Sequence, residues 1–116
     1  MNKRQIGEQY EQAAANLLAK QGINCIARNF NCKMGEIDLI CRDNNCFVFV
    51  EVRFRQQNNY GSAAATVSYA KQRKVQKAAM FFLKQQGLNI HHTEMRFDVV
   101  SFDFDVSQPN WIKSAF

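Results

Sequence analysis

The chain has 116 residues, of which 47% are hydrophobic and 22% are charged. These proportions are ordinary for a folded protein, so they exclude an extensively disordered chain and predict a single domain over residues 1–116. There are 15 Lys and Arg residues against 10 Asp and Glu, a formal net charge of +5. Such a charge suits a polyanionic partner, nucleic acid first, and it serves solubility equally well.

The N-terminal residues lack the apolar core of a signal peptide, and no apolar run approaches the ~20 residues that cross a bilayer. We therefore expect a cytoplasmic protein without a membrane partner, in which thiols are reduced. No two cysteines have the CxxC spacing common in zinc sites, so we interpret them as small buried hydrophobic side chains. The four are Cys25, Cys32, Cys41 and Cys46.

The first predicted element is a helix over residues 4–21, in which apolar side chains recur at helical spacing before Gly22. A turn is predicted at residues 42–45, because Asp and Asn tolerate the positive φ of a tight hairpin. Strands are predicted on both sides of this turn and before it, at residues 23–30, 35–41 and 47–55.

Residues 56–62 are polar and predict a loop, and residues 63–86 return to helical spacing before Gly87. After a further loop, residues 94–104 are rich in strand-forming side chains, and a turn at residues 107–110 leads into a short tail. The predicted order is helix, three strands, helix, and one or two strands. Strand pairs joined by a crossover helix predict an α/β fold with a mixed central sheet flanked by helices.

The second and third predicted strands carry acidic side chains in an otherwise apolar setting. If Cys41 pairs with Cys46 across the turn, Glu36 faces Glu51. Asp38 and Glu51 then become diagonal neighbours on one face of the sheet, within reach of each other's side-chain tips. The register thus predicts two converging carboxylates.

Converging carboxylates repel each other, so something must offset the cost. One candidate is a hard divalent cation, Mg²⁺ or Mn²⁺ as its substitute, held by the two carboxylates with waters and phosphate oxygens. Such a metal polarises a phosphodiester and lowers the pKa of an attacking water. The structural alternative is that Glu51 and Arg53, two residues further along the strand, pair with each other or with Glu36 on a solvated sheet face.

Five segments in a fixed order resemble the YraN family of uncharacterised bacterial proteins: GEIDLI (35–40), VFVEVRFR (48–55), YGSA (60–63), RFDVV (96–100) and WIKSAF (111–116). That family is similar to the restriction-endonuclease-like superfamily, near the archaeal-type Holliday junction resolvases. The resemblance implies a core of helix, three strands, helix and strand. Within RFDVV, a cross-strand pair of Arg96 and Asp98 is the simplest explanation of the charges.

The nuclease motif of that superfamily is an acid on one strand and (D/E)-x-K on the next, often with a Glu from the first helix. Carried onto this sequence, the resemblance implies Asp38 and Glu51 as the strand acids, with Arg53 in place of the lysine. The helix acid is Glu8 or Glu11, and the helical wheel favours Glu11. The implied metal ligands are therefore Glu11, Asp38 and Glu51.

Arg53 is the main departure from the motif, because an arginine holds phosphate charge but does not deprotonate to act as a base. Ile37 in place of proline and Tyr10 in place of glycine are lesser departures. Lys71 matches a family lysine on the second helix, and the implied catalytic set is Glu51, Arg53 and Lys71. The alternative for Lys71 is that its stem covers the edge of the core.

Four further basic residues could form a phosphate-binding surface, although a solvated helix face explains the last three equally well: Arg55, Arg73, Lys74 and Lys77. The leading hypothesis is a Mg²⁺-dependent nuclease acting on DNA rather than RNA, and on branched DNA in particular. The alternatives are a nucleic-acid-binding module that does not cut and a protein-interaction module. A four-way junction has two-fold symmetry, so a homodimer would suit the first hypothesis.

Overall fold

The protein is described by a computed structural model covering residues 1–55 and 67–116. A five-stranded sheet of order β1-β2-β3-β4-β5 forms its centre. The β3–β4 pair is parallel and the other three neighbouring pairs are antiparallel, so the sheet is mixed, as predicted. The strands are β1 (Asn24–Cys32), β2 (Gly35–Asp43), β3 (Cys46–Phe54), β4 (Met95–Phe102) and β5 (Pro109–Ile112).

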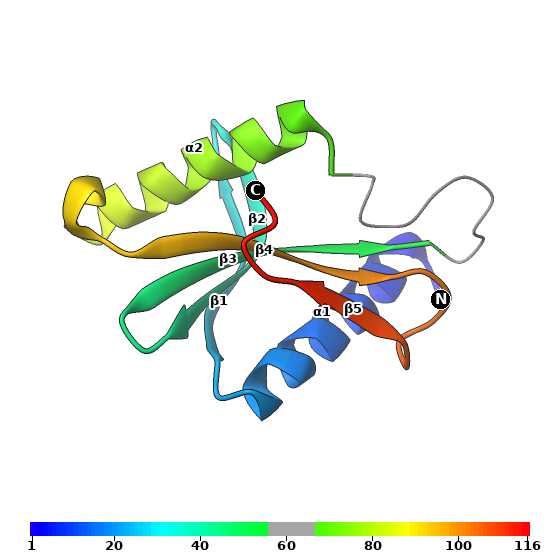
Figure 1. The fold of residues 1–116 in the computed structure, drawn as a ribbon. Coiled ribbons are helices and arrows are strands. Elements are labelled where there is room, and N and C mark those ends of the chain that lie inside the picture. Colours follow the sequence, from blue (N-terminus) through cyan, green and yellow to red (C-terminus); the bar gives the residue numbers. More distant parts are fainter. Residues whose placement is uncertain (56–66) are drawn as a thin grey trace.

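Two helices cover opposite faces of this sheet, α1 (Lys3–Lys20) below and α2 (Tyr69–Gln85) above in Figure 1. Each helix begins at a side chain that accepts a backbone hydrogen bond, Asn2 before α1 and Ser68 before α2. A short 3₁₀ helix, η2 (Ile90–His92), lies between α2 and β4. Within the described residues, neither helix is long and apolar enough to cross a membrane.

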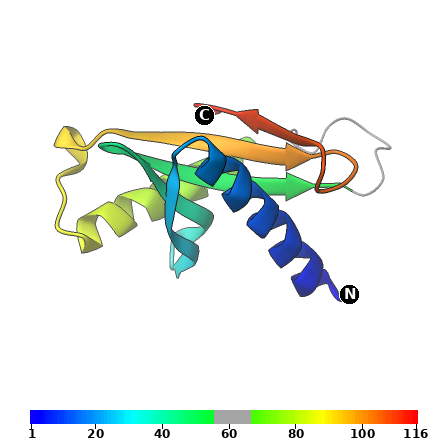
Figure 2. The same ribbon diagram turned by 90° about the horizontal axis from the view of Figure 1, so that it is seen from below.

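Each helix buries its apolar face against the sheet, which creates two hydrophobic clusters. Figure 2, seen from the α1 side, shows α1 lying across the strands, with β3, β4 and β5 side by side. The α1-side cluster includes Tyr10, Ala14 and Leu18 from the helix and Val48, Val50 and Phe102 from the sheet. The α2-side cluster includes Val75, Phe82 and Leu83 from the helix and Ile40, Phe49 and Phe97 from the sheet.

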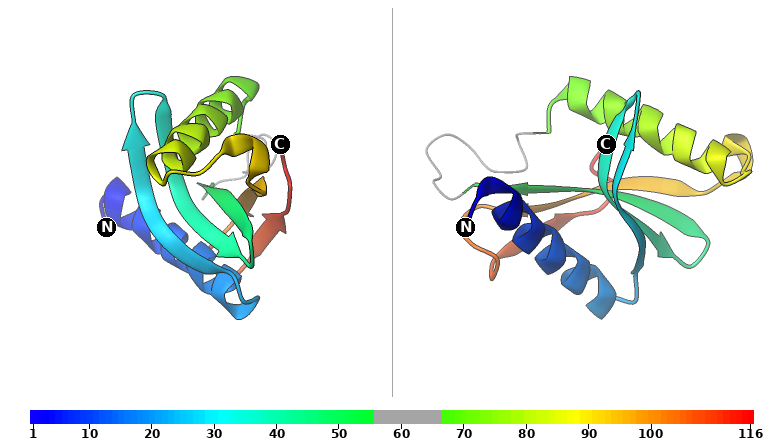
Figure 3. Two further views of the ribbon diagram at one scale, coloured as in Figure 1. Left: turned by 90° about the vertical axis from the view of Figure 1, so that its left-hand side faces the viewer. Right: turned by 180° about the vertical axis from the view of Figure 1, so that it is seen from behind.

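The β1–β2 hairpin curves from the α1 side of the sheet to the α2 side, as the left view of Figure 3 shows. Near its tip, Phe30 packs edge-on against Phe82 of α2, with ring centroids 5.3 Å apart. Ile37 and Leu39 would share one face of a regular strand, yet they belong to opposite clusters. The strand β2 therefore twists strongly at the residue between them, Asp38.

The predicted order of elements is confirmed, and Gly22 and Gly87 follow the two helices with φ of 80° and 75°. The second helix is predicted to begin at residue 63. This is wrong for residues 67 and 68, which lie before the start of α2 at Tyr69. Residues 56–66, which include the predicted loop, lie outside the described residues. The turn predicted at residues 107–110 is also wrong in its second half, because β5 begins at Pro109.

The predicted register between β2 and β3 is wrong by two residues. Cys41 pairs with Val48 rather than Cys46, and Cys46 pairs with Asp43. The turn contains only two residues, and Asn44 has the positive φ, 56°, that the Asn-rich sequence predicts. A two-residue shift leaves every side chain on its original face, so the apolar pattern does not distinguish the two registers.

Candidate functional site

Asp38 and Glu51, hereafter the acidic pair, lie where the backbone pairing of β2 and β3 stops. That pairing runs only as far as Leu39 opposite Val50. Beyond the Leu39–Val50 pair, the two carboxylates accept hydrogen bonds from backbone N–H groups instead. The Val52 N–H donates to Oδ2 of Asp38 at 2.8 Å, and the Asp38 N–H donates to Oε2 of Glu51 at 3.3 Å. The acidic pair thus takes the place of backbone pairing, and the two residues are closer to direct opposition than the predicted diagonal.

Two cations contact one oxygen of the acidic pair. Arg53 Nη2 lies 3.3 Å and Lys71 Nζ 3.7 Å from Oε1 of Glu51. The Glu51 side chain is fully buried, whereas the side chains of Arg53 and Lys71 are 25% and 27% exposed. The structural alternative is therefore correct about the Glu51–Arg53 contact but wrong about a solvated face. The cations connect a buried carboxylate to the protein surface.

Burial dominates the electrostatics of the acidic pair. The pKa of Glu51 is raised to about 7, first by burial and then by the charge of Asp38. The pKa of Asp38 is also raised, chiefly by burial. Hydrogen bonding from the Val52 N–H and the positive charges of Arg53 and Lys71 oppose the rise at Asp38 without cancelling it. The site therefore holds two carboxylates that bind protons more tightly than exposed ones do.

Glu11 of α1 lies beside this site but outside its hydrogen-bond network. Burial and then the charge of Asp38 raise the pKa of Glu11. Glu8, one turn earlier, is exposed and pairs with Arg4 at 3.5 Å. Across the described part of the chain, no group of three or more His, Cys, Asp or Glu side chains is arranged to hold a metal ion. Glu11 and the acidic pair therefore do not form a preassembled three-carboxylate cage.

The other predicted basic residues lie along or near α2. Arg73, Lys74 and Lys77 are on its exposed face, and Arg55, which follows β3, is half-buried. The Arg73 guanidinium lies 5.9 Å from the ring centre of Tyr69. Of the predicted cations, the structure brings Arg53 and Lys71 to the acidic pair and presents the three helix residues to solvent.

A second buried carboxylate, Asp98 of β4, has a different environment. Arg96 Nε lies 3.2 Å from both of its oxygens, and the Trp111 Nε1–H and Ser114 N–H donate to it at 3.0 and 2.9 Å. Arg96 also reaches Asp43 of β2 at 3.0 Å. The charges of RFDVV therefore join β4 to β2 and to the C-terminal tail, an arrangement more extensive than the predicted Arg–Asp pair.

Sequence reasoning missed one further contact. The cysteines are not uniformly buried as predicted, because only Cys41 is, and Cys25 and two others are half-buried. Cys25 and Cys41 lie opposite each other on β1 and β2. The two cysteines face each other because the β1–β2 register shifts between Cys25 and Ala27, and the sequence does not predict that shift.

The candidate site lies within the part of the chain that a protein-family model matches. A model described as "Uncharacterised protein family UPF0102" matches residues 10–102. The match covers most of the chain, including the acidic pair, Lys71 and Asp98. The chain belongs to this family, which is the YraN family that the sequence segments resemble.

Relatives in several bacteria match almost the whole chain. A UPF0102 protein of Photobacterium profundum is 49% identical over 115 residues, which is 99% of this chain and 92% of the relative. A UPF0102 protein of Aliivibrio salmonicida is 49% identical over 114 residues, covering 98% of this chain and 93% of the relative. One of Colwellia psychrerythraea is 44% identical over 117 residues. These similarities establish membership of the family.

Proposed function

We propose that this protein is a metal-dependent nuclease that acts on DNA phosphodiesters, with branched DNA as its preferred substrate, on a restriction-endonuclease-like core. One observation carries the proposal: the fully buried Glu51 and the half-buried Asp38 converge with raised pKa values, and two cations connect Glu51 to the surface. The order of helix, three strands, helix and strand agrees with such a core.

The acidic pair is costly to keep. A buried carboxylate loses hydration, and a second one beside it adds repulsion. An apolar pair at the same positions would avoid both costs. Strongly perturbed carboxylates of this kind concentrate at functional sites, where their chemistry compensates for the lost stability. This reasoning favours a functional role for Asp38 and Glu51 over a purely structural one.

The donor set of the acidic pair suits a hard cation. Mg²⁺ is usually bound through one or two carboxylates, with waters and substrate phosphates completing its shell, so a three-carboxylate cage is not required. Oδ1 of Asp38 accepts no hydrogen bond from the described residues, which leaves an oxygen available. A bound Mg²⁺, or Mn²⁺ in its place, supplies Lewis-acid polarisation of the phosphodiester and an attacking water of lowered pKa.

The two cations would bind the phosphate. Arg53 remains protonated, so it holds negative charge but does not act as a general base. Lys71 reaches the same oxygen of Glu51 from the first turn of α2 and would orient the phosphate from that side. A phosphate that attracts both cations would release Oε1 of Glu51. We therefore expect DNA and metal to bind cooperatively.

A second candidate, a DNA-binding module that does not cut, is favoured by one observation. Oε1 of Glu51 is already neutralised by Arg53 and Lys71, so the site is electrostatically balanced without a metal. In that case the same two cations would bind phosphate beside Arg73, Lys74 and Lys77. Binding would depend steeply on salt because it would rest on phosphate contacts.

Titration calorimetry with Mg²⁺ and Mn²⁺ tests the first proposal, with and without a four-way DNA junction. We expect wild type to bind metal more tightly with DNA present, and Asp38→Asn/Glu51→Gln to lose the binding. Glu36→Gln is the matched control, because Glu36 is an exposed carboxylate on the same strand as Asp38. If wild type binds no metal under either condition, the nuclease proposal is refuted.

Cleavage of the same junction is then measured for wild type, the double variant and the control. We expect cleavage by wild type and Glu36→Gln and none by the double variant. Metal binding without cleavage of any linear or branched DNA would instead favour the binding module. In that event Arg53→Ala and Lys71→Ala should weaken DNA binding and reduce its salt dependence.

A further inference from the structure

Cys25 and Cys41 form a close thiol pair away from the acidic pair. Their Sγ atoms lie 2.8 Å apart, with one thiol donating a hydrogen bond to the other. A disulfide bond has a length of about 2.05 Å, so the two sulfurs are close to bonding distance without being bonded. Both residues are free cysteines.

The backbone positions of this thiol pair are compatible with a disulfide. Cys25 and Cys41 are direct partners in the antiparallel β1–β2 ladder. Directly opposed residues of such a ladder have Cα atoms about 4.5–5.5 Å apart, and disulfides span about 4.4–6.8 Å. The bulge beside Cys25, between Cys25 and Ala27, brings the two cysteines into opposition. Closing the bond therefore requires little movement of either strand.

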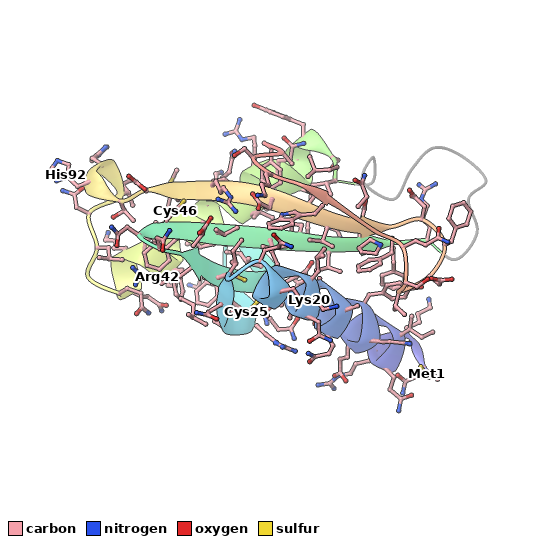
Figure 4. The ribbon with its side chains drawn as sticks, turned by 60° about the horizontal axis from the view of Figure 1, so that its bottom comes forward. Met1, Lys20, Cys25, Arg42, Cys46 and His92 are labelled. Carbon is pink, nitrogen blue, oxygen red and sulfur yellow. The ribbon has the colours of Figure 1, made fainter. Side chains whose placement is uncertain are left out.

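The two thiols differ in access and acidity. Cys25 is half-buried on β1, an edge strand of the sheet, and Figure 4 marks it just beyond the end of α1 at Lys20. Cys41 is fully buried. The hydrogen bond with Cys41 lowers the pKa of Cys25 to about 7, against the effect of burial, and the charge of Arg28 assists. The same hydrogen bond and burial raise the pKa of Cys41.

We propose that Cys25 and Cys41 are a redox-responsive pair that a low-molecular-weight disulfide such as glutathione disulfide oxidises reversibly. The Cys25 thiolate attacks one sulfur of the small disulfide, forming a mixed disulfide and releasing one thiolate. Cys41 loses its proton and attacks the Cys25 sulfur, which expels the second small thiol. The protein gives up two electrons and two protons, and one glutathione disulfide becomes two glutathione thiols.

The other two cysteines provide an internal comparison. The thiols of Cys32 and Cys46 contact backbone carbonyls, of Gly35 and Phe47, at 3.5 Å rather than another sulfur. Burial raises the pKa of Cys46, which reduces its thiolate fraction. We therefore expect a selective bridge from Cys25 to Cys41. It would tie the edge strand β1 to β2 at a position three residues from Asp38.

Peptide mapping after equilibration of the full chain in glutathione buffers tests this proposal. The sequence is favourable, because trypsin places each cysteine on a separate peptide: residues 21–28, 29–33, 34–42 and 43–53. After acid quenching and alkylation of free thiols, we expect peptides 21–28 and 34–42 to become linked, with loss of two hydrogens. We expect a higher thermal midpoint for the oxidised protein, because a cross-link restricts the unfolded chain.

The control variants separate this pair from general thiol oxidation. Cys32→Ser/Cys46→Ser keeps the proposed pair and should form the bridge at the same glutathione ratio as wild type. Cys25→Ser changes a half-buried thiol and should form no internal bridge while keeping the reduced protein's thermal midpoint. The proposal is overturned if wild type stays fully alkylated in glutathione disulfide alone. It is equally overturned if wild type collects mixed disulfides without the 21–28 to 34–42 link.

Discussion

Replacing Glu51 by Gln should stabilise the protein, and by an amount that depends on pH. Gln keeps the shape of the side chain and an oxygen for the Asp38 N–H, which donates to Glu51 at 3.3 Å. It removes a charge from a fully buried position. The wild-type carboxyl has its pKa raised to about 7 from an ordinary 4.5, so the folded protein favours its protonated form.

The sign and size of the effect follow from this difference in pKa. Between about pH 4.5 and about pH 7 the folded chain binds a proton at Glu51 that the unfolded chain has lost, so wild-type stability falls as pH rises through this window. The gap between 4.5 and about 7 corresponds to about 3 kcal/mol once Glu51 is fully ionised. At about pH 5 the same reasoning leaves less than about 1 kcal/mol.

Urea unfolding of wild type and Glu51→Gln at about pH 5 and about pH 8 measures the effect. We expect Gln to stabilise the protein by about 3 kcal/mol at the higher pH and to be nearly neutral at the lower one. The exposed Glu36→Gln should change stability by less than about 0.5 kcal/mol at both. A Glu51→Gln variant that is less stable at the higher pH would refute the reasoning. It would mean that the contacts with Arg53 and Lys71 outweigh burial.

Three further substitutions test the frame around the site. Asp98→Asn should destabilise the fold by about 3 kcal/mol, because Arg96 loses a buried charge partner. Urea unfolding followed by the fluorescence of Trp111, whose side chain donates to Asp98, measures this loss. Gly35→Ala should cost about 1–3 kcal/mol in urea unfolding, because its φ is 150° and an added Cβ would lie 3.2 Å from a side-chain carbon of α2. Gly7→Ala should instead increase the free energy of unfolding by about 0.5–1 kcal/mol, which a higher thermal midpoint would show. Gly7 lies inside α1, and there is open space where the added Cβ would be.

The order of the elements could be predicted from the sequence because their apolar periods differ clearly. The end of α1 was also predictable, since Gly22 adopts the positive φ that glycine permits at a helix end. The β2–β3 register was not. Asp43, Asn44 and Asn45 all suit a turn, and apolar alternation identifies the face of a strand but not a two-residue shift along it. The two-residue turn that forms moves Asp38 nearly opposite Glu51.

The members of the acidic pair could be proposed from the sequence, but their environment could not. The strand pattern predicts that carboxylates on neighbouring strands meet, but spacing alone slightly favours ion pairs on a solvated sheet face. Glu51 is fully buried, and its partner Lys71 comes from α2, which is far along the chain and places the Lys71 ammonium 3.7 Å from Glu51. The thiol pair could not be predicted from the sequence either, because a single bulge in β1 determines whether Cys25 faces Cys41.

Two buried carboxylates of the same sheet, Asp98 and Glu51, have different partners, and only Glu51 belongs to the site that we propose to be functional. Asp98 has a partner for both oxygens: Arg96 contacts the two of them, and Trp111 and Ser114 donate to one each. A carboxylate so surrounded holds strands and tail together, and a metal or phosphate would have to displace those contacts. Glu51 is equally buried but is balanced mainly by two partly exposed cations, which a phosphate can attract away. That difference, rather than burial itself, is our reason for proposing Glu51, and not Asp98, as the acid that takes part in chemistry.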